Sequence, residues 1–587
     1  MDIFSILTLV GGLALFLFGM EYMGDNLKKL SGGQLESILQ KLTSNRLKGF
    51  LLGLLVTAVI QSSSATTVML VGFVNSGIMA LSQSIAIIMG ANVGTTVTAW
   101  LLSTTGISGD LVWLKLLKPD SFTPILAVIG ILMTMVSKKE KKKDIGAILI
   151  GFAVLMFGME TMSGAMSGLK DNEAFSQILV AFKNPVLGIL CGTLLTAIIQ
   201  SSSASVGILQ ALSLTGAIPM STALPVILGQ NIGTTITPVL SAISGNRDSK
   251  RVAVSCVYIK IIGVVLISVP FYILNHFIGF SFMEGQASVF SIALVHTLFN
   301  ILSTVILIPF CSLIEKLAVS TIKSKGEAEN KEDDSLRVLD ERFLEIPDFA
   351  LEKAQEMLVE MVKIAISSVN TSLDKLFNYD EETEKEVMAQ EKLVDNYEDK
   401  LGAYLVKLAG HKLAEGQAND VTSLLHIIGD VERISDHACN LLDASKEIYT
   451  KKITFSDAAV KEIGIVSDAI KEILDIAGKS VESGNREFAI KIEPLEQVID
   501  MLKYRMKDKH IERLQNQECT IELGFVYSDI ITNFERIADH CSNIGVSILQ
   551  RDKGKFEPHE YLDHVKHDGE NNFTSQYDAY KEKYYII

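Results

Sequence analysis

Two short polar stretches decide the fold of this chain, "IQSSSATT" at Ile60–Thr67 and "IQSSSASV" at Ile199–Val206. Apolar residues flank the first one, with "LLGLLVTAV" before it and "VMLVGFV" after it. Within a bilayer, irregular or polar backbone is tolerated only where it is buried in protein or lines a water-filled cavity. The pattern therefore predicts two polar sites inside an apolar domain.

The charged residues divide the 587-residue chain into two parts. Residues 1–325 contain 21 Lys or Arg and 14 Asp or Glu, and the remainder contains 32 basic and 54 acidic residues. Several apolar runs of the first part reach the roughly 20 residues that a helix needs to cross a bilayer. We therefore predict a membrane domain over residues 1–320 and an acidic, water-soluble domain after it.

The first apolar run, Ile3–Met20, has no basic segment before it and no clear cleavage site. We interpret it as a retained transmembrane helix, with a signal peptide as the alternative. The six cysteines show no paired spacing, so disulfides are not expected, which is consistent with a cytosolic acidic domain.

The membrane part contains an internal repeat. "FGME" occurs at Phe18–Glu21 and at Phe157–Glu160, and "GANVGTTVT" at Gly90–Thr98 matches "GQNIGTTIT" at Gly229–Thr237. Both pairs, like the two serine-rich stretches, are offset by 139 residues. Three polar motifs in one register indicate a duplicated unit. We place the two repeats at about 1–138 and 145–315.

The length of the helix before each serine run predicts a re-entrant hairpin. Lys48 and Gln61 are 13 residues apart, which is roughly 20 Å of helix, whereas the hydrocarbon core is about 30 Å thick. The polar run then lies beyond the membrane midplane, and a second helix returns to the same side. We predict such hairpins over Arg46–Ser76 and Asn184–Thr215.

The remaining apolar segments predict the other membrane crossings. These lie near residues 3–23, 82–103, 122–137, 145–166, 222–242, 252–275 and 288–314. Three crossings in the first repeat place the second repeat upside down. The motifs "NVGTT" and "NIGTT" place a glycine followed by threonines inside an apolar span, which predicts a second discontinuous helix in each repeat. Inverted repeats whose interrupted helices meet at the midplane are a common plan of secondary transporters.

The basic residues predict the orientation of the chain in the membrane. The clusters "KKEKKK" (Lys138–Lys143) and "NRDSKR" (Asn246–Arg251) fall on one side of the predicted topology. The same side carries Lys28, Lys29, Lys41, Arg46 and Lys48. By the positive-inside rule this side is cytoplasmic, which places the N-terminus outside and the acidic half inside.

The predicted sites are free of charged side chains. The stretch between Phe50 and Trp100 contains no Asp, Glu, Lys or Arg, and neither does the stretch between Asn184 and Asn246. Neutral oxygens suit small alkali cations, and helix N-termini suit anions. Because a site without a fixed cation would bind a multivalent anion poorly, the pattern suggests symport of cations with an anion. The alternative is ordinary helix packing through small polar residues.

Two carboxylates in the membrane part leave their role open. Glu21 and Glu160 close the two "FGME" motifs at predicted helix ends. An interfacial position and a structural or coupling role are both consistent with such carboxylates.

The doubled motifs "QSSSATT…GANVGTT" and "QSSSASV…GQNIGTT" resemble the type II sodium-phosphate cotransporter family. The resemblance covers about residues 1–315 and implies sodium-coupled transport of inorganic phosphate, with both hairpin tips forming the site. The implied phosphate-binding residues are Ser62, Ser63, Ser64, Asn92, Ser201, Ser202, Ser203 and Asn231. The implied sodium-binding residues are Gln61, Thr95, Thr96, Gln200, Thr234 and Thr235. Ser205 and Val206 replace Thr66 and Thr67, so the two halves need not contribute equally.

The acidic half predicts a helical domain after a polar linker at 321–336, which includes "KSKGEAENKEDDS". Long amphipathic segments follow at about 340–378, 383–408, 417–450, 455–483, 488–515 and 520–550. Six such helices indicate two three-helix bundles at 337–550. The tail at 551–587 ends in "YDAYKEKYYII", which predicts one more short helix.

Four Glu-x-x-x-Asp motifs occur within a second duplication, in which "ERISDHACN" (Glu432–Asn440) matches "ERIADHCSN" (Glu535–Asn543). The spacing puts both carboxylates of a motif on one helix face. Clustered carboxylates suit Mg²⁺, Mn²⁺, Ca²⁺ or iron. The predicted metal-binding residues are Glu391, Asp395, Glu432, Asp436, Glu496, Asp500, Glu535 and Asp539. The alternative is a solvated face neutralised by Arg433 and Arg536.

The acidic half resembles the PhoU family of phosphate-uptake regulators over about residues 337–550. That family carries tandem three-helix bundles with Glu-x-x-x-Asp metal motifs, and the resemblance implies regulation rather than catalysis.

Together these observations predict an all-α, sodium-coupled phosphate transporter of the bacterial cytoplasmic membrane, regulated by its fused PhoU-like domain. The expected partners are phosphate, sodium, lipid, and regulatory proteins or another copy of the chain, without nucleic acid. The alternatives are a membrane phosphate sensor without transport and a net phosphate exporter. A metal-dependent hydrolase in the acidic half is not favoured, because no nucleophile or phosphate-cradling glycine loop accompanies the carboxylates.

Overall fold

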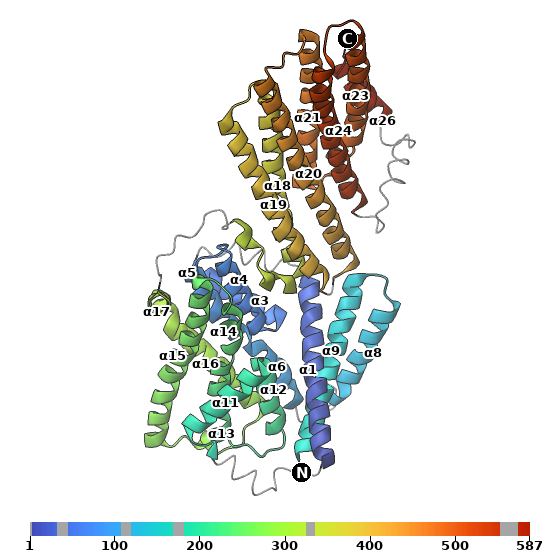
Figure 1. The fold of residues 1–587 in the computed structure, drawn as a ribbon. Helices are drawn as coiled ribbons and strands as arrows, with labels where there is room; N and C mark the ends of the chain where they lie inside the picture. The colour runs from blue at the N-terminus through green and yellow to red at the C-terminus, as the bar shows by residue number, and fades with distance from the viewer. Residues whose placement is uncertain are drawn as a thin grey trace. The chain divides into compact units, whose positions relative to one another are not determined.

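The computed structural model describes residues 3–31, 45–106, 119–167, 181–323, 335–411, 413–551 and 573–586. Helices dominate this described part, whose β-structure is a single isolated bridge between Pro219 and Gln286. The chain forms two compact units, Met1–Glu332 and Asp333–Ile587 (Figure 1). The predicted all-α fold is confirmed. Lys41, most of the predicted linker and the start of the tail lie outside the described residues.

The helices of the first unit reproduce the sequence repeat. The first set is α1 (Ile3–Ser31), α3 (Arg46–Ile60), α4 (Ser63–Asn75), α5 (Leu81–Gly94) and α6 (Thr96–Ser103). The second set is α9 (Glu140–Met166), α11 (Pro185–Ile199), α12 (Ser202–Ser213), α13 (Met220–Gly233) and α14 (Ile236–Ala242). After the shift of 139 residues, α3 coincides with α11 and α5 with α13 at both ends. The duplicated motifs therefore fold into equivalent elements.

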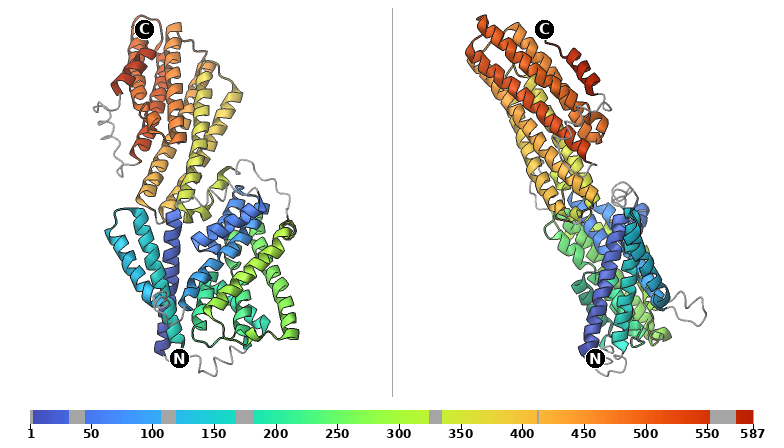
Figure 2. Two further views of the ribbon diagram at one scale, coloured as in Figure 1. Left: turned by 180° about the vertical axis from the view of Figure 1, so that it is seen from behind. Right: turned by 90° about the vertical axis from the view of Figure 1, so that its right-hand side faces the viewer.

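The two first helices of the repeats, α1 and α9, pack closely through glycines (Figures 1 and 2). A Cβ on Gly19 would lie 2.7 Å from the carbonyl oxygen of Gly151, and one on Gly158 would lie 2.8 Å from that of Gly12. Small residues allow helices in membranes to approach in this way. Because the contact order is reversed along the two helices, α1 and α9 run antiparallel, as an inverted repeat predicts.

The described part of the first unit contains four further α-helices. They are α8 (Pro119–Val136), α15 (Arg247–Ile278), α16 (Val289–Leu307) and α17 (Cys311–Thr321). Six helical stretches of the described residues are long and apolar enough to cross a membrane, and they contain six of the seven predicted crossings. The seventh, near 122–137, corresponds to a shorter apolar helix at Ser121–Val136. The first unit is thus a multi-pass membrane domain.

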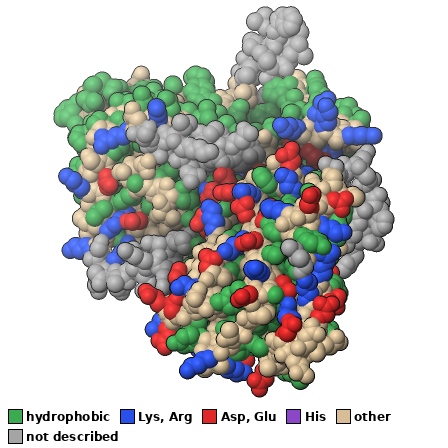
Figure 3. All heavy atoms as spheres, turned by 90° about the horizontal axis from the view of Figure 1, so that it is seen from above, with side chains coloured by type: hydrophobic (Ala, Val, Ile, Leu, Met, Phe, Trp, Pro, Cys, Tyr) green, Lys and Arg blue, Asp and Glu red, His purple; other side chains and the backbone are tan. Residues whose placement is uncertain are grey.

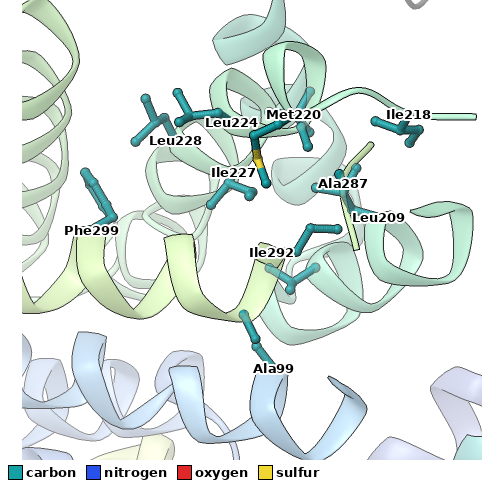
Figure 4. Packing of buried hydrophobic residues seen from close by; sticks show 14 of the residues in the cluster. Ala99, Leu209, Ile218, Met220, Leu224, Ile227, Leu228, Ala287, Ile292 and Phe299 are labelled. Atoms are coloured by element: carbon teal, nitrogen blue, oxygen red, sulfur yellow. The ribbon is translucent and has the colours of Figure 1, made fainter. Parts of the chain in front are cut away.

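The core of the first unit joins the two repeats. Ala99 of α6 packs in one buried cluster with Leu209 of α12, Ile227 of α13, and Ile292 and Phe299 of α16 (Figure 4). This packing brings the polar motif before α6 next to the second serine-rich stretch before α12.

The second unit contains the six predicted long helices. They are α18 (Pro347–Asp374), α19 (Glu381–Ala409), α20 (Glu415–Lys451), α21 (Asp457–Ser483), α23 (Ile492–Gln515) and α24 (Ile521–Gln550). A single turn, α22 (Arg486–Ala489), precedes α23, and the tail contains α26 (Phe573–Lys583). In Figure 3, acidic and basic side chains are interspersed over the lower part of the face toward the viewer, and hydrophobic side chains gather along the upper edge.

The predicted start of the first helix of this unit is wrong. The first helix begins at Pro347 instead of near residue 340, after a short 3-10 turn at Glu341–Glu345. Proline at the first helical position fixes φ and lacks the N–H that would otherwise be unpaired, so it favours a helix start there.

Candidate functional site

The serine-rich stretches form the turns of two helical hairpins, α3–α4 and α11–α12. At each turn a glutamine adopts the left-handed conformation, with φ 60° and ψ 19° at Gln61 and φ 60° and ψ 17° at Gln200. The main-chain N–H of Gln61 donates to the carbonyl of Thr57 at 2.8 Å, and that of Gln200 donates to the carbonyl of Thr196 at 2.7 Å. A residue other than glycine in this conformation costs on the order of 1 kcal/mol or more and tends to mark functional positions.

The second residue of each turn caps the returning helix. The hydroxyl of Ser62 accepts the N–H of Ala65 at 3.1 Å, and that of Ser201 accepts the N–H of Ala204 at 3.2 Å. Such caps satisfy one of the otherwise unpaired donors at a helix start. Each hairpin tip thus presents a helix N-terminus, where anions are favoured.

Buried hydroxyls hold the two arms of each hairpin together. Thr57 donates to Thr66 at 3.0 Å, and at the equivalent positions Thr196 donates to Ser205 at 2.8 Å. Ser205 therefore reproduces the bond made by Thr66. The hydroxyl that the second hairpin lacks is that of Thr67, which donates to the Ser63 carbonyl at 2.9 Å and is replaced by Val206.

Hydrogen bonds join the two hairpin tips to one another. The Ser64 hydroxyl donates to the main-chain carbonyl of Gln200 at 3.3 Å. The Ser203 hydroxyl donates to Thr98 Oγ1 at 3.4 Å, and Thr98 donates to Gln61 Oε1 at 2.8 Å. The structure therefore brings residues from both repeats into one polar cluster, which we call the tip cluster (Gln61, Ser64, Thr98, Gln200 and Ser203).

Thr98 is a member of the tip cluster that the sequence interpretation missed. It closes the motif "GANVGTTVT", and its repeat equivalent Thr237 closes "GQNIGTTIT". The Thr237 hydroxyl is buried and has no hydrogen-bond partner within the described residues. Both repeats have a threonine at this position of the motif, and this repetition could have identified Thr98 as a candidate site residue.

The motifs predicted to interrupt a second pair of helices cause only a small break. Helix α5 ends at Gly94 and α6 begins at Thr96, while Thr95 keeps right-handed helical angles. The hydroxyl of Thr95 donates to the main-chain carbonyl of Ala91, and that of Thr96 donates to the carbonyl of Val93. In the second repeat the hydroxyls of Thr234 and Thr235 make equivalent bonds to Gln230 and Ile232. In the second repeat α13 ends at Gly233 and α14 begins at Ile236, so both motifs interrupt their helices as predicted, but only by one or two residues.

Asn92 and Asn231 are both buried, at 8% and 2% exposure. The Asn231 side-chain oxygen accepts a hydrogen bond from the ammonium of Lys260 at 2.9 Å. The same ammonium donates to Asn300 at 3.2 Å, and Lys260 is itself 6% exposed. The expectation of a site with no fixed cationic side chain is thus wrong for the second repeat, because a lysine on α15 reaches Asn231. A single lysine inside the apolar run "VYIKIIGVV" was the signal.

The predicted metal-binding carboxylates of the first bundle raise one another's pKa values. Burial, and next the charges of Asp395 and Asp436, raises the pKa of Glu391. Burial, and next the charge of Asp436, raises the pKa of Glu432 to about 7. Arg433 lies 3.4 Å from Glu432 and 3.3 Å from Asp436, so the alternative of charge neutralisation is partly realised.

The carboxylates of the second bundle are neutralised more fully. The Lys503 ammonium lies 3.1 Å from Asp500 and 2.5 Å from Glu535. Arg536 lies 3.6 Å from Asp539. Burial, and next the charge of Glu493, raises the pKa of Glu496 to about 8. The motifs Glu391–Asp395 and Glu496–Asp500 are 105 residues apart, and the same offset aligns Glu398 of the first bundle with Lys503 of the second.

The carboxylates are not arranged as a formed metal centre. In the part of the chain that the structure describes, no group of three or more His, Cys, Asp or Glu side chains is placed to hold an ion. Metal binding by the eight predicted residues therefore stays a prediction.

Duplicated hairpins whose polar tips meet inside a multi-pass helical domain are a common plan of secondary transporters. A family model described as Na+/Pi-cotransporter matches residues 15–164 and 156–285, and a PhoU domain model matches 358–444 and 463–548. The chain belongs to the Na+/Pi-cotransporter family and carries a PhoU domain in its acidic half. Both resemblances predicted from the motifs are confirmed.

Similar proteins occur in bacteria and mammals. The chain is 23% identical to "Putative inorganic phosphate export protein YjbB" of Escherichia coli O157:H7 over 567 residues, which are 94% of this chain and 99% of that protein. It is 31% identical to "Uncharacterized protein YqeW" of Bacillus subtilis (strain 168) over 328 residues, 54% of this chain and 100% of that protein. It is 38% identical to "Sodium-dependent phosphate transport protein 2A" of Rattus norvegicus over 93 residues, 15% of this chain and 14% of that protein.

Proposed function

We propose that this protein couples the movement of inorganic phosphate across the bacterial cytoplasmic membrane to sodium. The observation that carries the proposal is the hydrogen-bonded chain from Ser203 through Thr98 to Gln61, together with the bond from Ser64 to Gln200. These bonds unite two neutral, hydroxyl-rich helix starts from the two repeats in one place. A site shared by two repeats can open to either side when the repeats move against each other.

We assign phosphate to the serines at the starts of α4 and α12. Ser62 to Ser64 and Ser201 to Ser203 offer hydroxyls and main-chain N–H groups at two helix N-termini. Phosphate oxygens accept such donors, and the helix dipoles favour negative charge there. Asn92 and Asn231 complete the proposed phosphate set, Asn231 through the second hydrogen of an amide whose first hydrogen bonds to Ile227.

We assign sodium to Gln61, Gln200 and the threonines of the two "GTT" motifs. The threonine hydroxyls of Thr95, Thr96, Thr234 and Thr235 donate to their own helices, but each oxygen keeps lone pairs for a cation. The glutamine oxygens supply further neutral ligands at the tips.

The arms of the hairpins are short, which supports re-entrant hairpins in an inverted repeat. Helices α3 and α4 contain 15 and 13 residues, about 20 Å each, against about 30 Å of hydrocarbon core. The basic clusters favour a cytoplasmic PhoU domain and an outside N-terminus. We infer that the PhoU domain regulates transport and is not an enzyme.

Net export of phosphate is a second candidate function. The relative from Escherichia coli O157:H7 carries "phosphate export protein" in its name. The direction of a coupled transporter follows the gradients, so the same site serves import or export.

The test is uptake of radiolabelled phosphate into proteoliposomes that contain the purified chain. An inward sodium gradient is compared with an equal potassium gradient. We expect sodium-dependent accumulation that a sodium ionophore abolishes. If the folded protein binds phosphate specifically but shows no sodium-dependent flux, the proposed transport is wrong and the protein is a membrane phosphate sensor.

A further inference from the structure

Lys260 lies near the middle of α15, a helix of 32 residues that is apolar enough to cross a membrane. Its ammonium is buried and contacts the side-chain oxygens of Asn231 at 2.9 Å and Asn300 at 3.2 Å. A lysine at such a depth is costly and marks a functional site.

The two asparagines are oriented to receive a cation. Asn231 Nδ2 donates to the carbonyl of Ile227 at 3.0 Å, and Asn300 Nδ2 donates to the carbonyl of His296 at 2.9 Å. With their nitrogens held by the backbone, both side chains turn their oxygens to one point. Helices α13 and α16 therefore supply two fixed neutral oxygens, the type of ligand that monovalent cations take in transporters.

The first repeat does not contain this lysine. Across the offset of 139 residues, Asn231 corresponds to Asn92, but Lys260 corresponds to Ser121. Among the described residues, the lysine bond to a buried asparagine of these motifs is found in the second repeat, at Asn231.

We propose that the Lys260 ammonium is a tethered cation that fills a monovalent cation site of the second repeat, between Asn231 and Asn300. This inference rests on the proposed sodium coupling and names the residue that makes the two halves unequal. A cation that cannot leave replaces one free sodium ion and adds fixed positive charge near the phosphate site. Removal of the ammonium opens the site to a free sodium ion.

The test is equilibrium binding of ²²Na⁺ to the purified full chain in detergent, which does not depend on transport. We expect Lys260→Ala to bind one more sodium ion per chain than the native protein. Lys260→Met removes the charge but fills the space, so it should gain none. Lys250→Ala, on the same helix but outside this cluster, is the control and should leave the count unchanged.

The outcomes separate the inference from the proposed function. An unchanged sodium count in folded Lys260→Ala overturns the tethered cation, and so does an equal gain in Lys260→Met, because the gain would then not need the vacated space. Lys260→Ser serves as a second variant if Lys260→Ala does not fold. If the native chain moves no phosphate in proteoliposomes, the proposed function fails while the sodium count still decides the role of Lys260.

Discussion

The hydroxyl of Ser64 donates a hydrogen bond to the main-chain carbonyl of Gln200, 136 positions later in the chain, at 3.3 Å. Ser64 lies in the first turn of α4, and Gln200 follows the last residue of α11 in the left-handed conformation. One hairpin tip thus contacts the backbone that shapes the other. A movement of one repeat against the other would lengthen or break this bond. The bond therefore couples the positions of the two hairpin tips.

Replacement of Gln61 should weaken sodium dependence more than stability. We expect Gln61→Ala to raise the sodium concentration for half-maximal phosphate uptake about tenfold, which is about 1.4 kcal/mol, because a ligand oxygen and the partner of Thr98 are lost. Gln200→Ala should act in the same direction with a smaller effect. Uptake at graded sodium concentrations measures both.

The matched control for these variants is glycine. Gln61→Gly removes the same side chain but relieves the positive φ, so it separates the side chain from backbone strain. Equal sodium dependence of Gln61→Ala and Gln61→Gly would support the amide as the ligand. Native sodium dependence in both alanine variants would remove the tip glutamines from the site.

The helix cap at Ser62 should contribute to stability, and the hydroxyl of Ser203 should contribute to phosphate binding. Ser62→Ala deletes a helix cap, which costs about 1 kcal/mol. Ser203→Ala loses only a long bond to Thr98, so we expect near-native melting and a several-fold higher KM for phosphate. Melting temperature and phosphate KM are measured on both variants. A Ser203→Ala variant with native KM would contradict the phosphate assignment.

Protonation of His510 should destabilise the second unit in acid. Burial, and next the charge of Arg513, lowers the pKa of His510, whose ring stacks on Tyr527 at 5.2 Å. The unfolded chain therefore binds more protons below pH of about 6.5, and stability falls as the pH drops from there. Hydrogen exchange of α23 at several pH values, corrected for intrinsic rates, measures the loss.

His510→Phe is the matched control, because it keeps an aromatic ring beside Tyr527 but does not titrate. We expect α23 of this variant to lose less protection between pH 7 and pH 5 than the native helix. The same loss in both proteins would assign the acid sensitivity to other groups.

The sequence predicted the repeats and the six long acidic-half helices because each rests on local pattern. Three motifs in one register predict equivalent helices in the two repeats, and amphipathic spacing predicts the long helices from α18 to α24. The contacts of Lys260 were not predictable, because they depend on how α13, α15 and α16 pack in space. The same holds for Thr98, which reaches Gln61 only through the packing of α6 against the hairpins. The slight break at Thr95 shows that a glycine-threonine motif does not by itself unwind a helix.

Deletion of residues 330–587 should leave sodium-coupled flux and alter its control. The first unit has its own buried cores, and its tip cluster is built entirely from residues before position 204. Phosphate uptake by the truncated protein, compared with the full chain at low and high phosphate, measures the change. Complete loss of flux in a folded truncated protein would make the PhoU domain part of the transport machinery.

Divalent metal should bind the first bundle of the PhoU domain more tightly than the second. The second bundle already holds the Lys503 ammonium between Asp500 and Glu535, whereas the first bundle has Glu398 at the equivalent position. We expect Glu391→Gln to lower the number of Mn²⁺ ions bound per chain at equilibrium. Lys503→Gln should raise that number, because two carboxylates lose their bound cation.

Isothermal titration with Mn²⁺ on the metal-free full chain measures both changes. Glu360→Gln is the control, since Glu360 is an exposed carboxylate of α18 outside the four motifs and pairs with Lys363 at 3.0 Å. Because Glu432 has a pKa of about 7, its ionised fraction grows as the pH rises, and Mn²⁺ affinity should increase between pH 6 and pH 8. If Mn²⁺ does not bind the native chain at pH 8, the carboxylates are a solvated face neutralised by Arg433, Lys503 and Arg536.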